Sequence, residues 1–302
     1  MPRPVDRLRR PRRRGGRTWV LGGGGGRGAA QVGALLALFE YGVEPPDRVI
    51  GVSVGALNGV VVAAYPSLAG AEMLREIWLS KQARDVFRTH PLNIVWSRIV
   101  GGTVAALPAS NVTRLIERAL QLCGVADFED LKLPLDVVAT DINAGRPHVF
   151  TCGPLLPALL ASTAIPGVFP AVKIEDHGYL DGGIVDNMPI SLAVEKGARE
   201  VMGIGLVAGG ELDHQPMGWA ELVARTLQLS LHHRMLSDYE RLRDRAKVVL
   251  LCPVLEPSEG MDMRRDHVEA IIDGVREATL RLLREQGRRL FARSSIHYVD
   301  ID

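Results

Sequence analysis

The stretch that decides the fold runs from Thr18 to Gly55 and reads TWVLGGGGGRGAAQVGALLALFEYGVEPPDRVIGVSVG. It contains two short segments typical of strands, residues 19–21 and 48–50, and each is followed by a turn that contains glycines. An apolar segment of helical length follows each turn. A strand, a glycine turn and a buried helix, repeated in so short a span, predict a parallel β-α-β arrangement.

The two turns offer different chemical groups. The five glycines at 22–26 do not serve helix or strand stability, because each costs roughly 0.5–1 kcal/mol relative to alanine inside such an element. They leave the backbone N–H groups at the start of a helix open to an anion. In the second turn, Gly51 and Gly55 flank Ser53, a spacing typical of a strand-to-helix turn that exposes a serine hydroxyl. Acyl transfer needs a nucleophile and an oxyanion hole, and these turns could supply both.

Neither turn is specific by itself. Gly23, Gly25 and Gly28 also match the spacing of a dinucleotide-binding loop, which expects an acidic residue about 20 positions later at a strand end. Glu44 and Asp47 lie instead in a Pro-rich loop before the second strand. A nucleotide-binding Rossmann protein therefore stays as the alternative interpretation, and cofactor binding would distinguish it.

Three motifs together resemble the patatin-like phospholipases: LGGGGGRGAA at 21–30, GVSVG at 51–55 and YLDGG at 179–183. The stretches ATD at 139–141, ASTAIPGVFP at 161–170 and DNMP at 186–189 are also similar to bacterial members of that family. The similarity covers residues 18–207, and the three motifs follow the order and rough spacing of the family.

The resemblance implies a catalytic dyad in which Ser53 is the nucleophile and Asp181 is the base, without a histidine. An aspartate is intrinsically a weak base, so the pair has to be direct and partly shielded from water. The expected oxyanion-hole residues are Gly24, Gly25, Gly26 and Gly28. The expected supporting residues are Arg27, Gly51, Gly55, Gly182, Gly183, Asp186 and Asn187.

Arg27 has two interpretations: it favours a negative charge nearby, or it anchors the loop through an ion pair. Asp186 and Asn187 are expected to keep the loop of Asp181 in shape. The histidines after Asp181 stand in polar loops or on charged helix faces. His232 and His233 are adjacent rather than four residues apart, so they do not face one metal. We expect no metal and no cofactor.

The charge distribution is uneven. The net charge is +1, but residues 1–17 contain eight arginines and one aspartate. We predict a disordered Arg-rich tail at 1–17 and one catalytic domain at 18–302, with a motif core at 18–207 and C-terminal helices at 216–290. The tail is either an inert solubilising terminus or a contact for anionic surfaces, and no specific nucleic acid is expected as a partner.

The chain is expected to be cytoplasmic, with peripheral membrane contact as an open possibility. Its three cysteines lack a C-x-x-C pair and are expected to be buried thiols, and no apolar run reaches 18 residues. The tail lacks the apolar core of a signal peptide. The apolar segment 91–109 is either a membrane-touching lid or, the favoured alternative, a packed connector.

The predicted fold class is α/β, a three-layer α/β/α sandwich with a mostly parallel central sheet. Helices are predicted at 28–41, 56–65 and 68–86, at 112–122 with Asn111 as N-cap, and in two long segments beginning near 219 and 268. Strands are predicted at 135–141, 146–151, 168–174, 178–180, 201–207 and 248–251. The expected activity is phospholipase A or lysophospholipase-type hydrolysis of a phospholipid or other lipid acyl ester. A lipid-binding pseudoenzyme is the third possibility.

Overall fold

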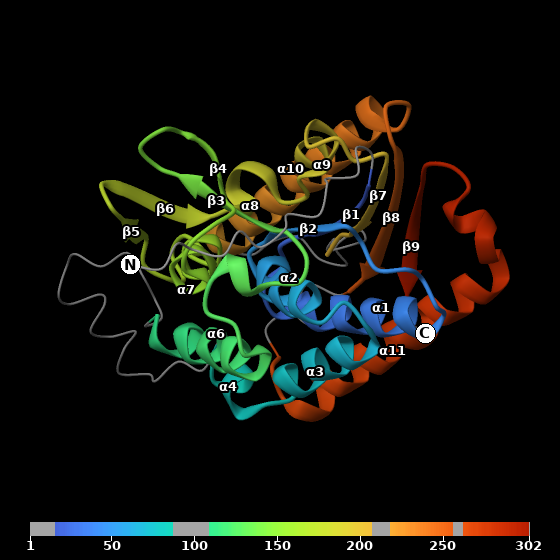
Figure 1. The fold of residues 1–302 in the computed structure, drawn as a ribbon. Helices are drawn as coiled ribbons and strands as arrows, with labels where there is room; N and C mark the ends of the chain where they lie inside the picture. Colours follow the sequence, from blue (N-terminus) through green and yellow to red (C-terminus); the bar gives the residue numbers. More distant parts are fainter. Residues whose placement is uncertain (1–15, 87–108, 207–217, 256–261, 302) are drawn as a thin grey trace, which may run out of the picture.

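The computed structural model describes residues 16–86, 109–206, 218–255 and 262–301. Within these residues a nine-stranded sheet forms the middle layer, and helices cover both of its faces (Figure 1). The strand order is β5-β6-β3-β2-β1-β7-β8-β9, with β4 paired to β3. The predicted α/β sandwich is therefore confirmed.

The strands are β1 (Arg17–Leu21), β2 (Arg48–Val52), β3 (Leu135–Asp141), β4 (Arg146–Phe150), β5 (Val172–Ile174), β6 (His177–Asp181), β7 (Glu200–Ile204), β8 (Lys247–Val254) and β9 (Ser295–Asp300). The helices are α1 (Gly28–Glu40), α2 (Val54–Ala64), α3 (Leu68–Trp78), α4 (Lys81–Asp85), α6 (Ser110–Cys123), α7 (Leu155–Ser162), α8 (Gly183–Asp186), α9 (Ile190–Glu195), α10 (Trp219–Leu242) and α11 (Arg265–Gln286). Short 3-10 helices are η1 (Gly25–Arg27), η2 (Phe128–Asp130) and η4 (Gly287–Phe291).

The strands from β3 through β2, β1, β7 and β8 to β9 are parallel to one another. The strands β4, β5 and β6 are antiparallel to their neighbours at the other side of the sheet. Since β1 and β2 are adjacent and parallel, the glycine turns that follow them meet at the same edge of the sheet. This is the edge at which open α/β sheets bind ligands.

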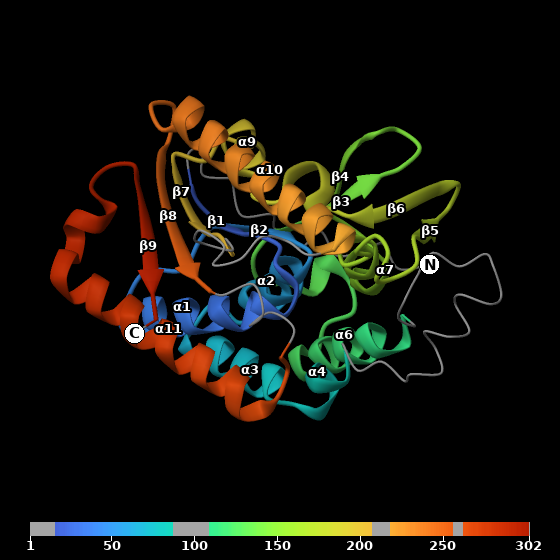
Figure 2. The ribbon, with the colours of Figure 1, turned by 180° about the vertical axis from the view of Figure 1, so that it is seen from behind.

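Both faces of the parallel strands are buried, as expected for a sheet between two helical layers. In β1, Trp19 and Leu21 pack with α1, α2 and α11 on one face. The intervening Val20 packs with α9 and α10 on the other face. The two views from opposite sides show these helix layers on either side of the sheet (Figures 1 and 2). The period of two along β1 thus produces two separate cores.

Several boundaries differ from the sequence predictions. The helix predicted at 68–86 is divided, because α3 ends at Trp78 and the Ser80 hydroxyl caps α4 by accepting the Ala83 N–H. Asn111 lies inside α6 and donates its amide to the Asp85 carbonyl oxygen, so its prediction as N-cap is wrong. β5 begins only at Val172, β9 was not predicted, and the Cys152 thiol is exposed rather than buried.

Two predicted segments, 1–17 and 91–109, lie largely outside the described residues. β1 includes Arg17, which the sequence analysis assigned to the tail, while residues 1–15 lie outside the described residues. Residues 91–108 of the apolar segment also lie outside them. Among the helices that are described, none combines the length and the hydrophobicity needed to cross a bilayer.

The packing of α1 against α11 yields a stability prediction at Gly33. A Cβ atom at this position would overlap the Ile272 carbonyl oxygen of α11. We expect Gly33→Ala to lower the free energy of unfolding by about 1–3 kcal/mol through overpacking. Intrinsic helix propensity alone would raise it by roughly 1 kcal/mol. Denaturant unfolding therefore distinguishes overpacking from helix propensity by the sign of the change in the free energy of unfolding. A variant more stable than the wild type would contradict the close packing.

Candidate active site

Ser53 lies on a sharp turn between β2 and α2. Its backbone angles are φ 54° and ψ −126°, a conformation that is uncommon for a residue with a side chain. Gly55 allows α2 to press against the end of β1, because a Cβ there would overlap the carbonyl oxygens of Leu21 and Gly22. Gly51 similarly has no room for a Cβ beneath the first turn of α2. The flanking glycines thus serve close packing, and Ser53 itself takes the strained conformation.

Ser162 restrains this turn, and the sequence analysis gave it no role. The Ser53 N–H donates to the Ser162 Oγ at 2.8 Å. The Ser162 hydroxyl in turn donates to the Val138 carbonyl oxygen at 2.6 Å. Ser162 is fully buried at the end of α7, so it connects the turn to β3. The signal in the sequence was a serine at the end of an otherwise apolar helix.

Asp181 reaches Ser53 from the end of β6. The backbone crosses β3 at Gly182, where a Cβ would overlap the Val138 carbonyl oxygen. The Asp181 carboxylate accepts a hydrogen bond from the Gly183 N–H at 2.8 Å, and the Ser53 hydroxyl lies close enough to interact with it. Burial raises the pKa of Asp181 to about 6, and the interactions with Ser53 and Gly183 partly oppose that rise. The structure therefore brings the predicted pair into direct contact, shielded from water.

The glycine loop lies beside Ser53. A Cβ on Gly23 would stand 3.1 Å from the Ser53 Cβ. Within the described residues, the N–H groups of Gly24, Gly25 and Gly26 have no hydrogen-bond partner. The Gly28 N–H, in contrast, donates to the carbonyl oxygens of Gly25 and Gly26. Three of the four predicted oxyanion donors thus have no partner among the described residues, and Gly28 is engaged within the loop.

A buried polar network supports this loop from below. The Trp78 indole N–H donates to the Asn58 Oδ1 at 2.9 Å. The Asn58 amide donates to the Gln31 Oε1 at 2.9 Å and to the Gly28 carbonyl oxygen at 3.2 Å. The Gln31 amide donates to the Gly22 carbonyl oxygen at 2.8 Å. Both ends of the glycine loop are therefore tied to side chains of α1, α2 and α3 that the sequence analysis did not single out.

Arg27 anchors the loop through a carbonyl oxygen rather than through an acid. Its Nε donates to the Gly24 carbonyl oxygen at 3.4 Å, and within the described part of the chain no carboxylate pairs with it. Its Nη1 is buried without a described partner. Burial lowers the pKa of this guanidinium. Among the described residues, Arg27 is thus held by a carbonyl oxygen, and both interpretations of its role stay predictions.

Asp186 and Asn187 connect the Asp181 loop to its surroundings. The Asn187 side-chain amide donates to the Gly23 carbonyl oxygen at 3.2 Å, so it joins the two loops of the site. The buried Asp186 carboxylate lies 3.6 Å from the guanidinium of Arg234 on α10. Burial raises the pKa of Asp186 to about 6, and Arg234 opposes the rise. Arg234 is another contact that sequence reasoning missed.

The histidines and acidic residues of the alternative interpretations lie elsewhere. His177 pairs with Asp141 at 2.8 Å, His214 lies outside the described residues, and no described histidine bonds to Ser53 or Asp181. The described part of the chain contains no group of three or more side chains that could hold a metal ion. Glu44 and Asp47 both bond to Arg17 at the amino end of β1, away from the glycine loop.

The fold and this site define an α/β protein whose Ser–Asp pair lies at the carboxyl edge of its parallel strands. The model of the family described as patatin-like phospholipase matches residues 19–194, which is more than half of the chain. The chain belongs to the patatin-like phospholipase family.

Several proteins of known name are similar to this chain over a part of their length. Patatin-like phospholipase domain-containing protein 7 of Rattus norvegicus is 33% identical over 64% of this chain and 14% of its own length. An uncharacterized NTE family protein of Mycobacterium bovis is 28% identical over 69% of this chain and 55% of its own. The chain thus spans only a part of these relatives. The crystal structure of VipD from Legionella pneumophila is similar with a TM-score of 0.47 and 15% identity, over 89% of this chain and 67% of that one.

The contact between Ser162 and the Ser53 backbone predicts a positioning role. Ser162→Ala leaves the Ser53 N–H without its buried acceptor, at a cost of about 1–3 kcal/mol. If Ser53 is the nucleophile, we expect ester turnover to fall by about tenfold or more through kcat, with KM little changed, because the Ser53 hydroxyl is displaced and the substrate site is not.

Steady-state kinetics with a soluble p-nitrophenyl ester measure this effect. Ser162→Thr is the matched variant, because it keeps the bridging hydroxyl and should retain more activity than Ser162→Ala. Equal losses in the two variants would point to packing rather than to the hydrogen bond.

Proposed function

We propose that this chain hydrolyses carboxylic esters of lipid acyl chains, with Ser53 as the nucleophile and Asp181 as the base. The observation that carries the proposal is the placement of the Ser53 hydroxyl beside the buried Asp181 carboxylate, whose pKa is raised to about 6. A carboxylate with an ordinary pKa is a poor base for a serine hydroxyl, because the pKa of the hydroxyl is much higher. The raised pKa of Asp181 reduces the difference between the two pKa values.

In the first half of the proposed reaction, the Ser53 Oγ attacks the ester carbonyl carbon and its proton passes to Asp181. The carbonyl oxygen becomes an oxyanion, and the N–H groups of Gly24, Gly25 and Gly26 would stabilise it. The tetrahedral intermediate then collapses. The bond to the leaving alcohol breaks, Asp181 returns the proton to that alcohol, and the acyl chain stays on Ser53.

In the second half, water attacks the acyl-Ser53 carbonyl while Asp181 accepts a proton from the water. Collapse of the second intermediate releases the fatty acid and returns the proton to the Ser53 oxygen. Since the site needs only a hydroxyl, a carboxylate and backbone N–H groups, no step of this proposal requires a cofactor. The lipid substrate is inferred from the family, and the proposed action is of phospholipase A or lysophospholipase type.

Peripheral membrane contact and a cytoplasmic location remain predictions. The two segments that the sequence analysis considered for membrane contact, 1–17 and 91–109, lie almost wholly outside the described residues.

The first functional prediction concerns Ser53. Ser53→Ala should abolish ester hydrolysis and covalent labelling by a fluorophosphonate probe, because both need its hydroxyl oxygen. Mass spectrometry of the labelled wild-type chain should place the adduct on Ser53. Ser110→Ala, which changes an exposed serine of α6, is the control and should label normally. Labelling that persists in Ser53→Ala would remove this residue from the mechanism.

The second functional prediction concerns Asp181 and pH. The base must be unprotonated, and its pKa is raised from 3.8 to about 6. The value of kcat/KM should therefore be full above this pKa and be lost as pH falls through about 6. Asp181→Asn keeps the shape of the site but removes the base, and turnover should fall by up to ~10⁴-fold.

His177→Ala is the control for this experiment, because His177 is bonded to Asp141 at the edge of the sheet. It should retain activity and the same pH profile. If His177→Ala were inactive while Asp181→Asn remained active, the dyad would be the wrong mechanism.

A further inference from the structure

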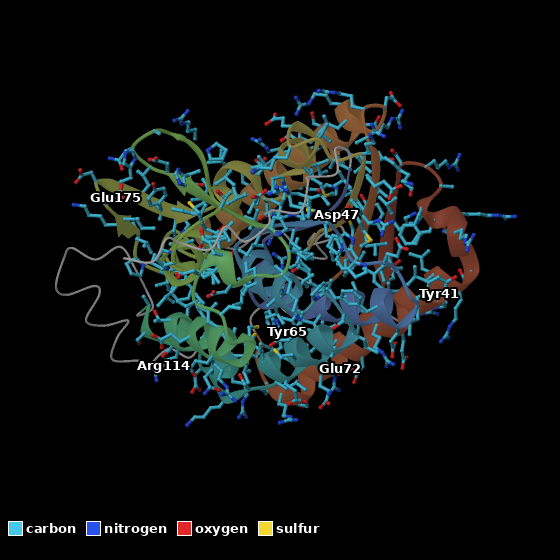
Figure 3. All side chains as sticks on the ribbon, in the orientation of Figure 1. Tyr41, Asp47, Tyr65, Glu72, Arg114 and Glu175 are labelled. Carbon is cyan, nitrogen blue, oxygen red and sulfur yellow. The ribbon has the colours of Figure 1, made fainter. Side chains whose placement is uncertain are left out.

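A cavity lies apart from Ser53, where α3, α4, α6 and the start of α11 come together at the lower edge of the molecule in Figure 1. Its volume is about 670 Å3, which falls within the range of ~300–1,000 Å3 typical of small-molecule sites. In Figure 3, Glu72 and Arg114 mark two of the bordering helices, α3 and α6. None of the residues placed at the Ser53 site lines this cavity.

Four of the eleven residues that line the cavity are basic. Lys81 and Arg84 come from α4, Arg118 comes from α6, and Arg265 comes from the first turn of α11. Glu76 is the single carboxylate among the lining residues, and it forms no ion pair with any of the four cations. In the described parts of the chain, none of these four cations has a hydrogen-bonding or ion-pairing partner.

On the surface next to the cavity, arginines are paired with acidic residues. Arg75, also on α3, lies 2.6 Å from Glu269 and 3.3 Å from Asp273 of α11. Arg276 of α11 pairs with Glu40 of α1 at 2.6 Å. Outside the cavity, cations of α3 and α11 are thus paired with acids, whereas the four cations around the cavity have no partner among the described residues. Like charges gathered on one cavity repel each other, and a bound anion would relieve that repulsion.

The interior of the cavity adds an apolar surface. The half-buried Leu122 lines it, beside Ile77 and Leu79, which are exposed by only 1% and 2%. The side-chain amides of Gln82 and Gln121 also line it and can donate hydrogen bonds. Arginine guanidinium groups match the geometry of phosphate oxygens and bind them through paired hydrogen bonds. The cavity thus offers several phosphate-binding cations beside a patch that can contact carbon atoms.

We propose that this cavity binds a multiply charged phosphate compound, with Arg84, Arg118 and Arg265 contacting the phosphate groups. The shared chemistry is a polyanionic phosphate group on a carbon framework, supplied either by a soluble compound or by a lipid headgroup. The site is separate from the ester chemistry, and its existence does not rest on the proposed function.

The test uses the full-length chain with Ser53→Ala, so that no lipid is consumed during the measurement. Isothermal titration with inositol hexakisphosphate at ~0.15 M salt measures the soluble source. Co-sedimentation with phosphatidylcholine vesicles, with and without phosphatidic acid, measures the lipid source. The cavity variant is Arg84→Gln/Arg118→Gln. The control is Arg288→Gln/Arg289→Gln, which removes the same charge from exposed residues of η4.

We expect the cavity variant to bind inositol hexakisphosphate about tenfold more weakly or worse, while the control binds as the parent does. A matching loss on phosphatidic acid vesicles would identify a lipid headgroup as a source, and a loss confined to the titration would identify a soluble compound. A second cavity variant, Lys81→Gln/Arg265→Gln, should reproduce the loss with an unchanged Tm. Equal weakening by cavity and control variants, or no binding of either probe by the parent, would overturn the proposal.

Discussion

The backbone conformation of Ser53 is the constraint on which the rest of the site depends. A residue with a side chain at φ 54° and ψ −126° carries strain of order 1–3 kcal/mol, and it persists only where its surroundings leave no alternative. Here α2 presses on the end of β1 through Gly55. The Ser162 hydroxyl holds the strained N–H from the other side. Packing and one hydrogen bond together keep the serine oxygen directed at Asp181.

The second constraint is the burial of polar groups around the glycine loop. A loop of glycines has no side chains with which to hold its own shape, so the restraint has to come from outside it. Gln31, Asn58 and Trp78 supply it through hydrogen bonds in which each buried partner is satisfied. Asp181 stands in the opposite situation, because burial disfavours its charged form. A rigid network whose polar groups are all hydrogen-bonded thus lies beside one carboxylate whose charged form is destabilised. Functional sites commonly combine a stable scaffold with a destabilised group.

The sequence was most informative for the turns whose shape depends on residues close together in the chain. The spacing of Gly51, Ser53 and Gly55 predicted a strand-to-helix turn, and the adjacency of β1 and β2 followed from the repeated β-α pattern. The polar residues that restrain these turns could not be found in this way. Gln31, Asn58 and Ser162 lie in apolar helices, and their partners are distant in the chain. A single sequence gives no means of pairing them.

The errors in the predicted elements have similar causes. The hydrophobic period continues across Ser80, and only its capping hydrogen bond reveals that α3 has ended. Asn111 has the residue type of an N-cap, but its amide is used to bind Asp85 of α4. β9 has a mixed, half-exposed pattern because it forms one margin of the sheet beside β8. In each case a tertiary contact decided the local structure.

The central position of β1 in the sheet has a consequence for how this chain can be synthesised and shortened. β1 pairs with β2 on one side and with β7 (Glu200–Ile204) on the other, and α1 is covered by α11, near the end of the chain. During synthesis, β7 emerges from the ribosome only after nearly two hundred further residues, so the second edge of β1 stays uncovered until then. A fragment cut at the limit of the family match, residue 194, would keep Ser53 and Asp181 but expose a bare apolar strand edge, a known template for aggregation. The unit that folds is thus longer than the unit that carries the motifs.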